Sequence, residues 1–257
     1  MAPQAIAKML IARAADLRAV ATFLTRLPLG NPDVGDAPIA RILWAFPVVG
    51  WGLGLGVGAV FASGLAFGLG VLPAAVLAVA MEVWATGAFH EDGLADTADG
   101  LGGATQEDSL EMLRDSRLGT FGVSALALSL AARFAVIAAV AEPLAVIALL
   151  ATAGAISRAA LAWPMALLPP ARADGMSAFI GVPTLREALI ASVIALGLAL
   201  ISVGIGLTGI AVVVAAIGAG AVSAMARRAF GGQTGDVLGA TQQVTYVLLL
   251  LVLSARI

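Results

Sequence analysis

The chain has 257 residues, of which 61 % are hydrophobic and only 12 % are charged, and its formal net charge is −2. A helix that spans a bilayer needs about 20 mostly apolar residues, and the sequence has several such runs. This composition excludes an ordinary soluble domain and indicates an all-α, polytopic helical membrane protein, built as a single domain over residues 1–257. The absence of cysteine excludes disulfides and thiolate chemistry. No nucleic-acid partner is expected.

The N-terminal residues 4–27 have the pattern of an amphipathic helix. Apolar side chains recur at three- and four-residue steps from Ile6 to Leu24, while Lys8 and Arg26 lie on the opposite side. Such a helix lies at the membrane surface with its apolar stripe in the acyl boundary. A Pro-, Gly- and Asp-rich loop follows. Residues 1–41 are therefore predicted to form an interfacial helix and loop, followed by a transmembrane bundle over 42–257.

About six or seven spanning helices are predicted within this bundle. The candidate spans are residues 42–63, 66–89, 118–140, 143–163, 187–205, 206–226 and a shorter one at 241–255. Longer polar loops connect them at 90–117, 164–186 and 227–240, and these are the predicted catalytic loops. In the first span, Gly50, Gly54 and Gly58 form a small-xxx-small row, which predicts a helix-packing face and not a nucleotide fingerprint.

The distribution of basic residues predicts the orientation. If the N-terminus is cytoplasmic, all three longer loops lie on the same side as it. Lys and Arg prefer short cytoplasmic loops, which favours this orientation. We therefore expect a multi-pass protein of the cell inner membrane with its N-terminus, catalytic loops and active site at the cytoplasmic face. The basic residues that this orientation places in the cytoplasm are Lys8, Arg13, Arg18, Arg26, Arg41, Arg114, Arg117, Arg172, Arg186, Arg227 and Arg228.

The segment GAFHEDGLADTADGLGG (Gly87–Gly103) concentrates acidic residues and contains the only histidine, His90. On a regular helix, Asp92, Asp96 and Asp99 fall within about 60° of one another and share one face. Like charges at this spacing repel, whereas a bound Mg²⁺ reverses the sign of the interaction. The pattern predicts a Mg²⁺ site made of these three carboxylates, with Glu82 as a further ligand; a solvated acidic loop is the alternative.

Glycines within the acidic segment support this interpretation. Gly93 and Gly100 each cost about 1 kcal/mol relative to Ala inside a helix. Close approach of a phosphate or of a second backbone would explain why they are there.

Two further polar segments have the residue types of a phosphate site. In MLRDSRLGTFG (112–122), Arg114 and Arg117 can hold phosphate oxygens bidentately, although an interfacial anchor is an equal alternative. In RRAFGGQTGDVLGA (227–240), backbone N–H groups around Gly232, Thr234 and Gly235 can form an anion-binding concavity. The alternative there is a flexible turn.

Two isolated charged residues extend this set. Asp236, in the second of these segments, can add a carboxylate to the metal site. Arg158 lies inside a predicted span, where a charge is normally paired or functional. Glu82 or a substrate phosphate can supply the opposite charge that pairs with Arg158.

The segments EVWATGAFHEDGLADTADG, RDSRLGTFG and GGQTGDVLGA occur in this order and together resemble the cobalamin synthase (adenosylcobinamide-GDP ribazoletransferase) family. FLTRLPL (23–29) and ISRAALAWP (156–164) extend the resemblance over most of the chain. Two positions depart from the family pattern. Arg114 replaces a frequent Lys and keeps the charge, and Tyr246 lies near where an acidic residue often follows the last motif.

The resemblance implies a membrane-bound, Mg²⁺-dependent transferase late in the cobalamin pathway. It would join adenosylcobinamide-GDP to α-ribazole or its 5′-phosphate and release GMP by phosphoryl transfer. Arg114, Arg117 and Arg158 would hold phosphate oxygens, and Asp96, Asp99 or His90 would act as the base. The partners would be these substrates and the lipid bilayer, with a second copy in a homodimer as a further candidate.

Three other functions are weighed against this one. A CDP-alcohol phosphotransferase also uses clustered Asp and Gly, but Asp96 stands where its pattern has Arg. A cation transporter would place its acids near the bilayer midplane, whereas these lie at the end of a span. A scaffold would not need three polar motifs on one face.

Overall fold

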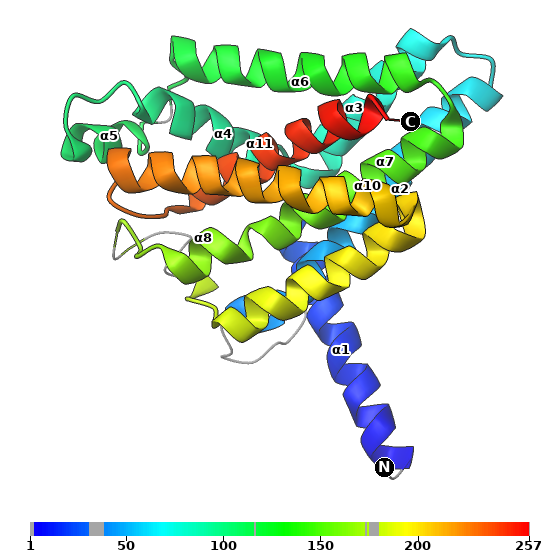
Figure 1. The fold of residues 1–257 in the computed structure, drawn as a ribbon, viewed down its shortest axis with the longest axis horizontal. Helices are drawn as coiled ribbons and strands as arrows, with labels where there is room; N and C mark the ends of the chain where they lie inside the picture. Colours follow the sequence, from blue (N-terminus) through cyan, green and yellow to red (C-terminus); the bar gives the residue numbers. More distant parts are fainter. Residues whose placement is uncertain (1–2, 31–38, 116, 173, 175–179, 257) are drawn as a thin grey trace.

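The computed structural model describes residues 3–30, 39–115, 117–172, 174 and 180–256, and this part of the chain is helical without a named strand. Figure 1 shows most of the helices running side by side, while α1 extends away from them. The elements are α1 (Pro3–Leu24), the 3-10 helix η1 (Ile39–Ile42), α2 (Ala45–Ala66), α3 (Val71–Thr86), α4 (Phe89–Gly100), α5 (Gln106–Met112), α6 (Thr120–Val140), α7 (Pro143–Ala160), α8 (Ala162–Leu167), α10 (Leu185–Ala229) and α11 (Gly235–Ser254).

Among the described residues, five helical runs are long and apolar enough to cross a membrane, and the bent pair α3–α4 makes six. One of the five, α10, has 45 residues and breaks at Gly204, whose φ of 73° is left-handed. Its arms, 185–203 and 205–229, fold back on each other (Figure 1) and measure about 28 and 37 Å at 1.5 Å per residue. Each arm is long enough to cross a bilayer, so the lengths of the helices are compatible with the predicted six or seven spans. The predicted polytopic all-α fold is confirmed.

The glycine row of α2 packs directly on α7. A Cβ at Gly50 would lie 2.1 Å from the carbonyl oxygen of Gly154, and one at Gly54 would lie 2.3 Å from that of Leu150. At Gly58 the nearest atom, Ile147 Cα, would be 2.7 Å away. The predicted helix-packing face is therefore confirmed, and its partner is α7.

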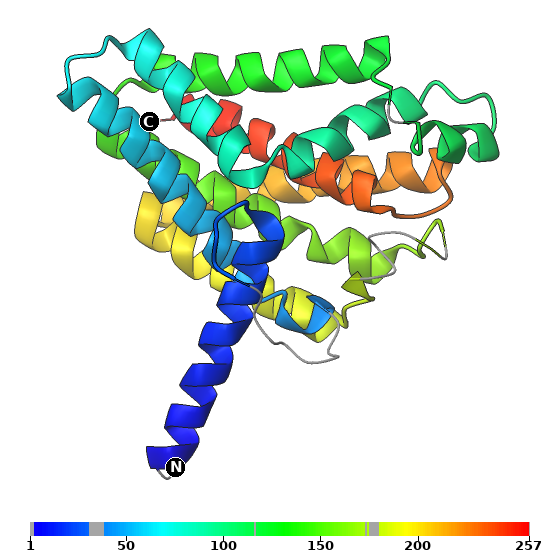
Figure 2. The same cartoon turned by 180° about the vertical axis from the view of Figure 1, so that it is seen from behind.

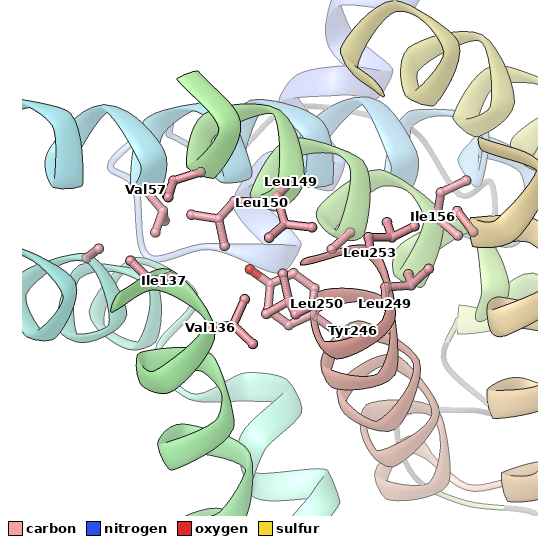
Figure 3. Close-up of a cluster of buried hydrophobic side chains, with 14 of the residues drawn as sticks. Val57, Val136, Ile137, Leu149, Leu150, Ile156, Tyr246, Leu249, Leu250 and Leu253 are labelled. Carbon is pink, nitrogen blue, oxygen red and sulfur yellow. The ribbon is translucent and has the colours of Figure 1, made fainter. Parts of the chain in front are cut away.

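The main hydrophobic core lies where α2, α6, α7 and α11 meet. Every residue from Leu149 to Ala160 of α7 is buried, so this helix runs through the interior. Figure 3 shows Tyr246 of α11 among aliphatic side chains of the other helices. Aliphatic side chains around it are Val57, Val136, Ile137, Leu149, Leu150, Leu249, Leu250 and Leu253.

The prediction of one continuous span over 66–89 is wrong. Helix α3 ends at Thr86, and α4 leaves it at an angle of 87°. Gly87 and Ala88 both adopt left-handed backbone conformations, with φ of 66° and 59°. Glycine does so without cost, and it ends α3 as its C-cap. The bend directs the polar helix α4 along the bundle, beside α11 and α6.

Helix α1 ends earlier than predicted. Arg26 lies beyond the helix, and its backbone N–H donates to the carbonyl of Ala85 at 2.7 Å, so it is not part of a polar helix face. Val20 and Leu24 are buried against the bundle, whereas Leu10 and Ile11 are exposed on the part that extends away (Figure 2). The interfacial position of α1 stays a prediction, and residues 31–38 of the predicted loop lie outside the described residues.

The predicted catalytic loops are largely helical. The segment 90–117 contains most of α4 and all of α5, and α11 begins at Gly235 instead of at residue 241. Residues 173 and 175–179 of the predicted loop 164–186 lie outside the described part. The end of α4, α5, the start of α6, the end of α10 and the start of α11 all lie at one end of the bundle (Figure 1).

Candidate functional site

The centre of this end is the crossing of α4 and α11. A Cβ at Gly93 would lie 2.7 Å from the backbone oxygen of Asp236 and 3.1 Å from Cα of Gly239. Only glycine at these positions lets the two backbones approach so closely. A second backbone, and not a phosphate, is therefore what Gly93 contacts. Gly100 packs instead on the side chains of Leu113 and Phe230.

This crossing places three carboxylates near one another, and we name Asp92, Asp96 and Asp236 the carboxylate cluster. Asp92 is exposed, while Asp96 and Asp236 are half-buried. The charge of Asp96 interacts with the charges of Asp92, Asp236 and, more weakly, Asp99. Arg172 is the nearby cation: its Nη2 lies 3.4 Å from Oδ2 of Asp236. Like charges held this close favour binding of a cation or of a cation-bearing ligand.

The donor chemistry of the cluster fits Mg²⁺. Within the described residues, no three acidic or histidine side chains converge closely enough to form a ready-made metal cage. Mg²⁺ does not require one, since it usually takes one or two carboxylates and completes its shell with water and substrate phosphates. The cluster is therefore suited to a metal ion that binds together with a phosphate-bearing substrate.

Asp99 has a different environment from the cluster. Its Oδ2 accepts a hydrogen bond from the backbone N–H of Gly119 at 2.7 Å, and its Oδ1 accepts one from Gly122 at 2.8 Å. These N–H groups belong to the start of α6, which otherwise lacks a side-chain cap. A Cβ at either glycine would come within 2.4 Å of this carboxylate. The geometry gives Asp99 the role of fixing α6 to α4.

Glu82 is not brought to the cluster, because the bend after α3 separates it from the aspartate face of α4. It lies 6 % exposed beside Arg133, whose Nη1 is 3.5 Å from Glu82 Oε2 and whose Nη2 is 2.8 Å from Glu91 Oε1. Gln243 of α11 also accepts a hydrogen bond from Arg133. This buried network joins α3, α4, α6 and α11.

The site residues predicted from the sequence do not include Arg133, Glu91 or Gln243. A charge inside a span requires a partner, and this rule could have identified Arg133 from the sequence. Pairing Arg133 with Glu91 from the sequence alone would have required knowing that the chain bends at residues 87–88.

Arg158 and His90 are buried away from solvent. Arg158 is 2 % exposed; its Nη1 donates to the carbonyl of Gly154 at 3.2 Å, and its Nε has no hydrogen-bond partner. Its charge interacts with that of Glu82, one of the two partners expected for it. The His90 ring is 3 % exposed and packs edge-on against Phe89, with ring centroids 5.2 Å apart. Neither side chain is open to a substrate in this conformation.

The two arginines of the 112–122 segment are exposed and differ in position. Arg117 pairs with Asp115 at 2.6 Å and holds the pKa of that carboxyl at about 2. Arg114 lies 3.2 Å from Asp174 and lines an open cavity of about 1100 Å³ together with Arg172. Since Arg172 also contacts Asp236, this cavity adjoins the carboxylate cluster, and Arg114 is the predicted arginine that the structure brings near it.

The glycine-rich segment before α11 is held tightly in place. Thr234 is the N-cap of α11, because its Oγ1 accepts from the N–H of Val237 at 3.2 Å and also donates to Asp236 at 3.3 Å. A Cβ at Gly232 would lie 2.1 Å from the carbonyl oxygen of Pro169. Gly235 is the first residue of α11 and lines a small cavity of about 30 Å³ beside His90.

This packing explains the position of Arg172, for which the sequence predicts only a place on the cytoplasmic side. The N–H of Gln233 donates to Pro169 and the N–H of Ala171 donates to Gln233, both at 2.9 Å. The bridge holds the chain just before Arg172 against the start of α11. Arg172 is thereby brought to Asp236.

Fold and site define a polytopic helical membrane protein that gathers carboxylates and guanidinium groups at one end, a combination suited to phosphoryl transfer. The family model described as cobalamin-5-phosphate synthase matches residues 16–254. The chain belongs to the cobalamin-5-phosphate synthase family. The resemblance predicted from the sequence motifs is thereby confirmed, and the family match decides against the CDP-alcohol phosphotransferase and cation-transporter alternatives.

Individual relatives agree with this assignment. The protein named adenosylcobinamide-GDP ribazoletransferase from Bradyrhizobium diazoefficiens is 43 % identical to this chain over 243 residues, which cover 94 % of both chains. The protein of the same name from Mesorhizobium japonicum is 41 % identical over 243 residues, covering 94 % of this chain and 93 % of the relative. The one from Azorhizobium caulinodans is 42 % identical over 249 residues, covering 92 % and 94 %. No solved structure is significantly similar.

Proposed function

We propose that this chain joins adenosylcobinamide-GDP to α-ribazole or α-ribazole 5′-phosphate, giving adenosylcobalamin or its 5′-phosphate and GMP. The names of the relatives support this reaction. The observation that carries it is the crossing of α4 and α11, which sets Asp92 and Asp96 beside Asp236 and Arg172. Carboxylates for a metal and cations for phosphate oxygens are the two requirements of a diphosphate-cleaving site.

The transfer balances as a single displacement at phosphorus. The ribazole hydroxyl oxygen forms a bond to the phosphorus that carries cobinamide, and the bond from this phosphorus to the bridging oxygen breaks. GMP leaves with that oxygen and its electron pair. The hydroxyl proton passes to a base on the protein.

Asp96 is the base that we propose among the three candidates. Both oxygens of Asp99 accept backbone hydrogen bonds, and His90 is buried against Phe89, whereas Asp96 is half-buried in the cluster. Its partial burial and, to a smaller extent, the neighbouring carboxylates favour its protonated form after the transfer.

The diphosphate requires positive charge around it. Arg172 and Arg114, which line the same cavity, are proposed to hold phosphate oxygens. Asp92 and Asp236 are proposed to hold Mg²⁺, which would neutralise charge on the transferred phosphoryl group. Arg158 is proposed to act indirectly, through the buried charges near it. Arg117, paired at the surface, is given no direct contact with substrate.

We further propose that the protein lies in the inner membrane with the carboxylate cluster at the cytoplasmic face. The basic residues near the cluster support this orientation, since Lys and Arg concentrate on the cytoplasmic side. Both substrates are polar and water-soluble, so a cytoplasmic site is where they would meet. Association of two copies into a homodimer stays a prediction.

The experiment that tests the reaction supplies purified protein in liposomes with adenosylcobinamide-GDP and either α-ribazole or its 5′-phosphate. Mass spectrometry identifies the corrinoid product, and chromatography quantifies GMP. The proposal expects one GMP per corrinoid joined, in Mg²⁺ but not in excess EDTA. GMP formation without a joined corrinoid would contradict the transfer, and activity that EDTA leaves unchanged would contradict the metal.

A further inference from the structure

An apolar groove lies between the two arms of α10, and nothing in the proposed reaction uses it. It has a volume of about 660 Å³ and is lined by both arms of α10 together with α7 and α8. Figure 1 shows the two arms diverging from the bend at Gly204, with α7 and α8 beside them. We name this space the α10 groove. Its walls are mostly aliphatic, with Ile156, Leu196 and Val212 among them.

Of the residues that line the α10 groove, only Arg227 is charged, and it lies at one end. Arg227 follows Ser223 by one turn, whereas Val212 lies near the bend. Trp163 and Ser192 also line the groove, but the indole N–H of Trp163 donates to the hydroxyl of Ser192. Arg227 is exposed, and no salt bridge is formed by it with any described residue. The chain continues from Arg227 into the segment that caps α11, so the polar end of the groove is also the end at which the carboxylate cluster lies.

The length of the groove fits one leaflet of a bilayer. From Val212 to Arg227 the second arm rises about 22 Å at 1.5 Å per residue. Half of a hydrocarbon core of about 30 Å is about 15 Å, which leaves room for a head group at the Arg227 end. An apolar groove that stayed empty would forfeit dispersion contacts along its whole wall. An amphiphile with an acyl chain and an anionic head matches the shape and the polarity.

We propose that the α10 groove binds one anionic phospholipid, with an acyl chain along the second arm of α10 and the lipid phosphate on Arg227. A guanidinium group donates two parallel hydrogen bonds to phosphate oxygens, which suits Arg227 for this contact. The bound lipid fills the space between the arms of α10 and fixes the end of the helix that leads to the carboxylate cluster.

Two pairs of variants test the site, one for the contact with the acyl chain of the lipid and one for the contact with its head group. Gly220 lines the groove and Gly209 does not, yet a Cβ at either would meet no atom within 4 Å. Gly220→Leu therefore fills the groove, and Gly209→Leu is its matched control on the same arm. Arg227→Gln removes the head-group contact, and Arg228→Gln is the control, because Arg228 is exposed but does not line the groove.

The measurement is native mass spectrometry of the protein in detergent, titrated with phosphatidylglycerol and, separately, with phosphatidylcholine. One phosphatidylglycerol should bind at least about tenfold more tightly than further copies, a difference of about 1.4 kcal/mol. Gly220→Leu and Arg227→Gln should each weaken this first binding at least fivefold, and both controls should leave it unchanged. Equal loss in variant and control would overturn the site, and equal affinity for phosphatidylcholine would overturn the head-group assignment. A dimer that Gly220→Leu abolishes, without any bound lipid, would assign the groove to a second copy instead.

Discussion

Asp96 and Asp99 lie one helical turn apart on α4 but have different surroundings. The oxygens of Asp99 accept two backbone hydrogen bonds from the start of α6, while Asp96 lies among the other carboxylates. The sequence places both on one helix face, which is correct, and it cannot distinguish their roles. That distinction depends on which helix packs over each carboxylate.

The role of Asp99 leads to a stability prediction. In Asp99→Asn one of the two backbone N–H groups, at Gly119 or Gly122, faces an amide NH₂ and loses its acceptor. A buried unsatisfied donor costs about 1–3 kcal/mol, so the melting temperature in detergent should fall. Asp92→Asn, at an exposed position of the same helix, is the control and should melt like the wild type. An unchanged melting temperature for Asp99→Asn would contradict the proposed link between α4 and α6.

The buried network around Arg133 should contribute strongly to stability. Arg133→Gln leaves Glu82 and Glu91 buried without their cation, and breaking a buried pair in this way costs about 3–5 kcal/mol. Thermal unfolding in detergent measures the loss. Arg117→Gln breaks only an exposed pair and should leave the melting temperature within error. Similar effects of the two substitutions would show that the buried network stabilises the protein no more than an exposed ion pair does.

At the scale of elements, the contact between α2 and α7 depends on alternate glycines. A side chain at Gly54 would collide with the backbone of Leu150, whereas one at Gly56 would meet no atom within 4 Å. We therefore expect Gly54→Leu to destabilise the protein by about 1–3 kcal/mol or prevent its folding. Gly56→Leu on the same helix should be tolerated. Size-exclusion profiles and melting temperatures report both, and equal tolerance would mean that α2 and α7 pack differently.

How far the sequence predicts the elements follows from the same physics. Hydrophobic length identifies α2, α6, α7 and both arms of α10, and the small-residue row identifies a packing face. The prediction from hydrophobic length fails at residues 66–89. This run is apolar enough for one span, but two residues with left-handed backbone conformations bend the chain there. The same prediction also assigns a loop to 90–117, where contacts with α11 and α6 support the short polar helix α4. It assigns another to 227–240, where α11 already begins at Gly235.

The same limit applies to the candidate site. Asp92, Asp96 and Asp236 are recognisable from their residue types, and the structure brings them together. Arg172 cannot be recognised as a site residue from the sequence, because its position depends on the hydrogen-bonded bridge between Pro169 and Gln233. Glu82 is misjudged for the converse reason, since extending one straight helix through Gly87 places it near the aspartates.

At the scale of the whole molecule, the absence of cysteine makes the proposed orientation easy to test. Glu107→Cys places a thiol on exposed α5, at the end of the carboxylate cluster, and Phe67→Cys places one at the opposite end, where the side chain is 89 % exposed. In spheroplasts, a membrane-impermeant maleimide should label Phe67→Cys at once. Glu107→Cys should react only after the membrane is opened, and the reverse pattern would contradict a cytoplasmic site.

The central claim is that the crossing of α4 and α11 builds the site of a transferase, and GMP release tests it most directly. The rate would be measured with saturating adenosylcobinamide-GDP, α-ribazole and Mg²⁺ for the wild type, Asp96→Asn and Asp16→Asn. Asp16 is a carboxylate on α1 to which the reaction assigns no role. We expect Asp96→Asn to lower the rate at least about 100-fold without lowering the melting temperature, and Asp16→Asn to keep the wild-type rate. A wild-type rate in Asp96→Asn would contradict the central claim.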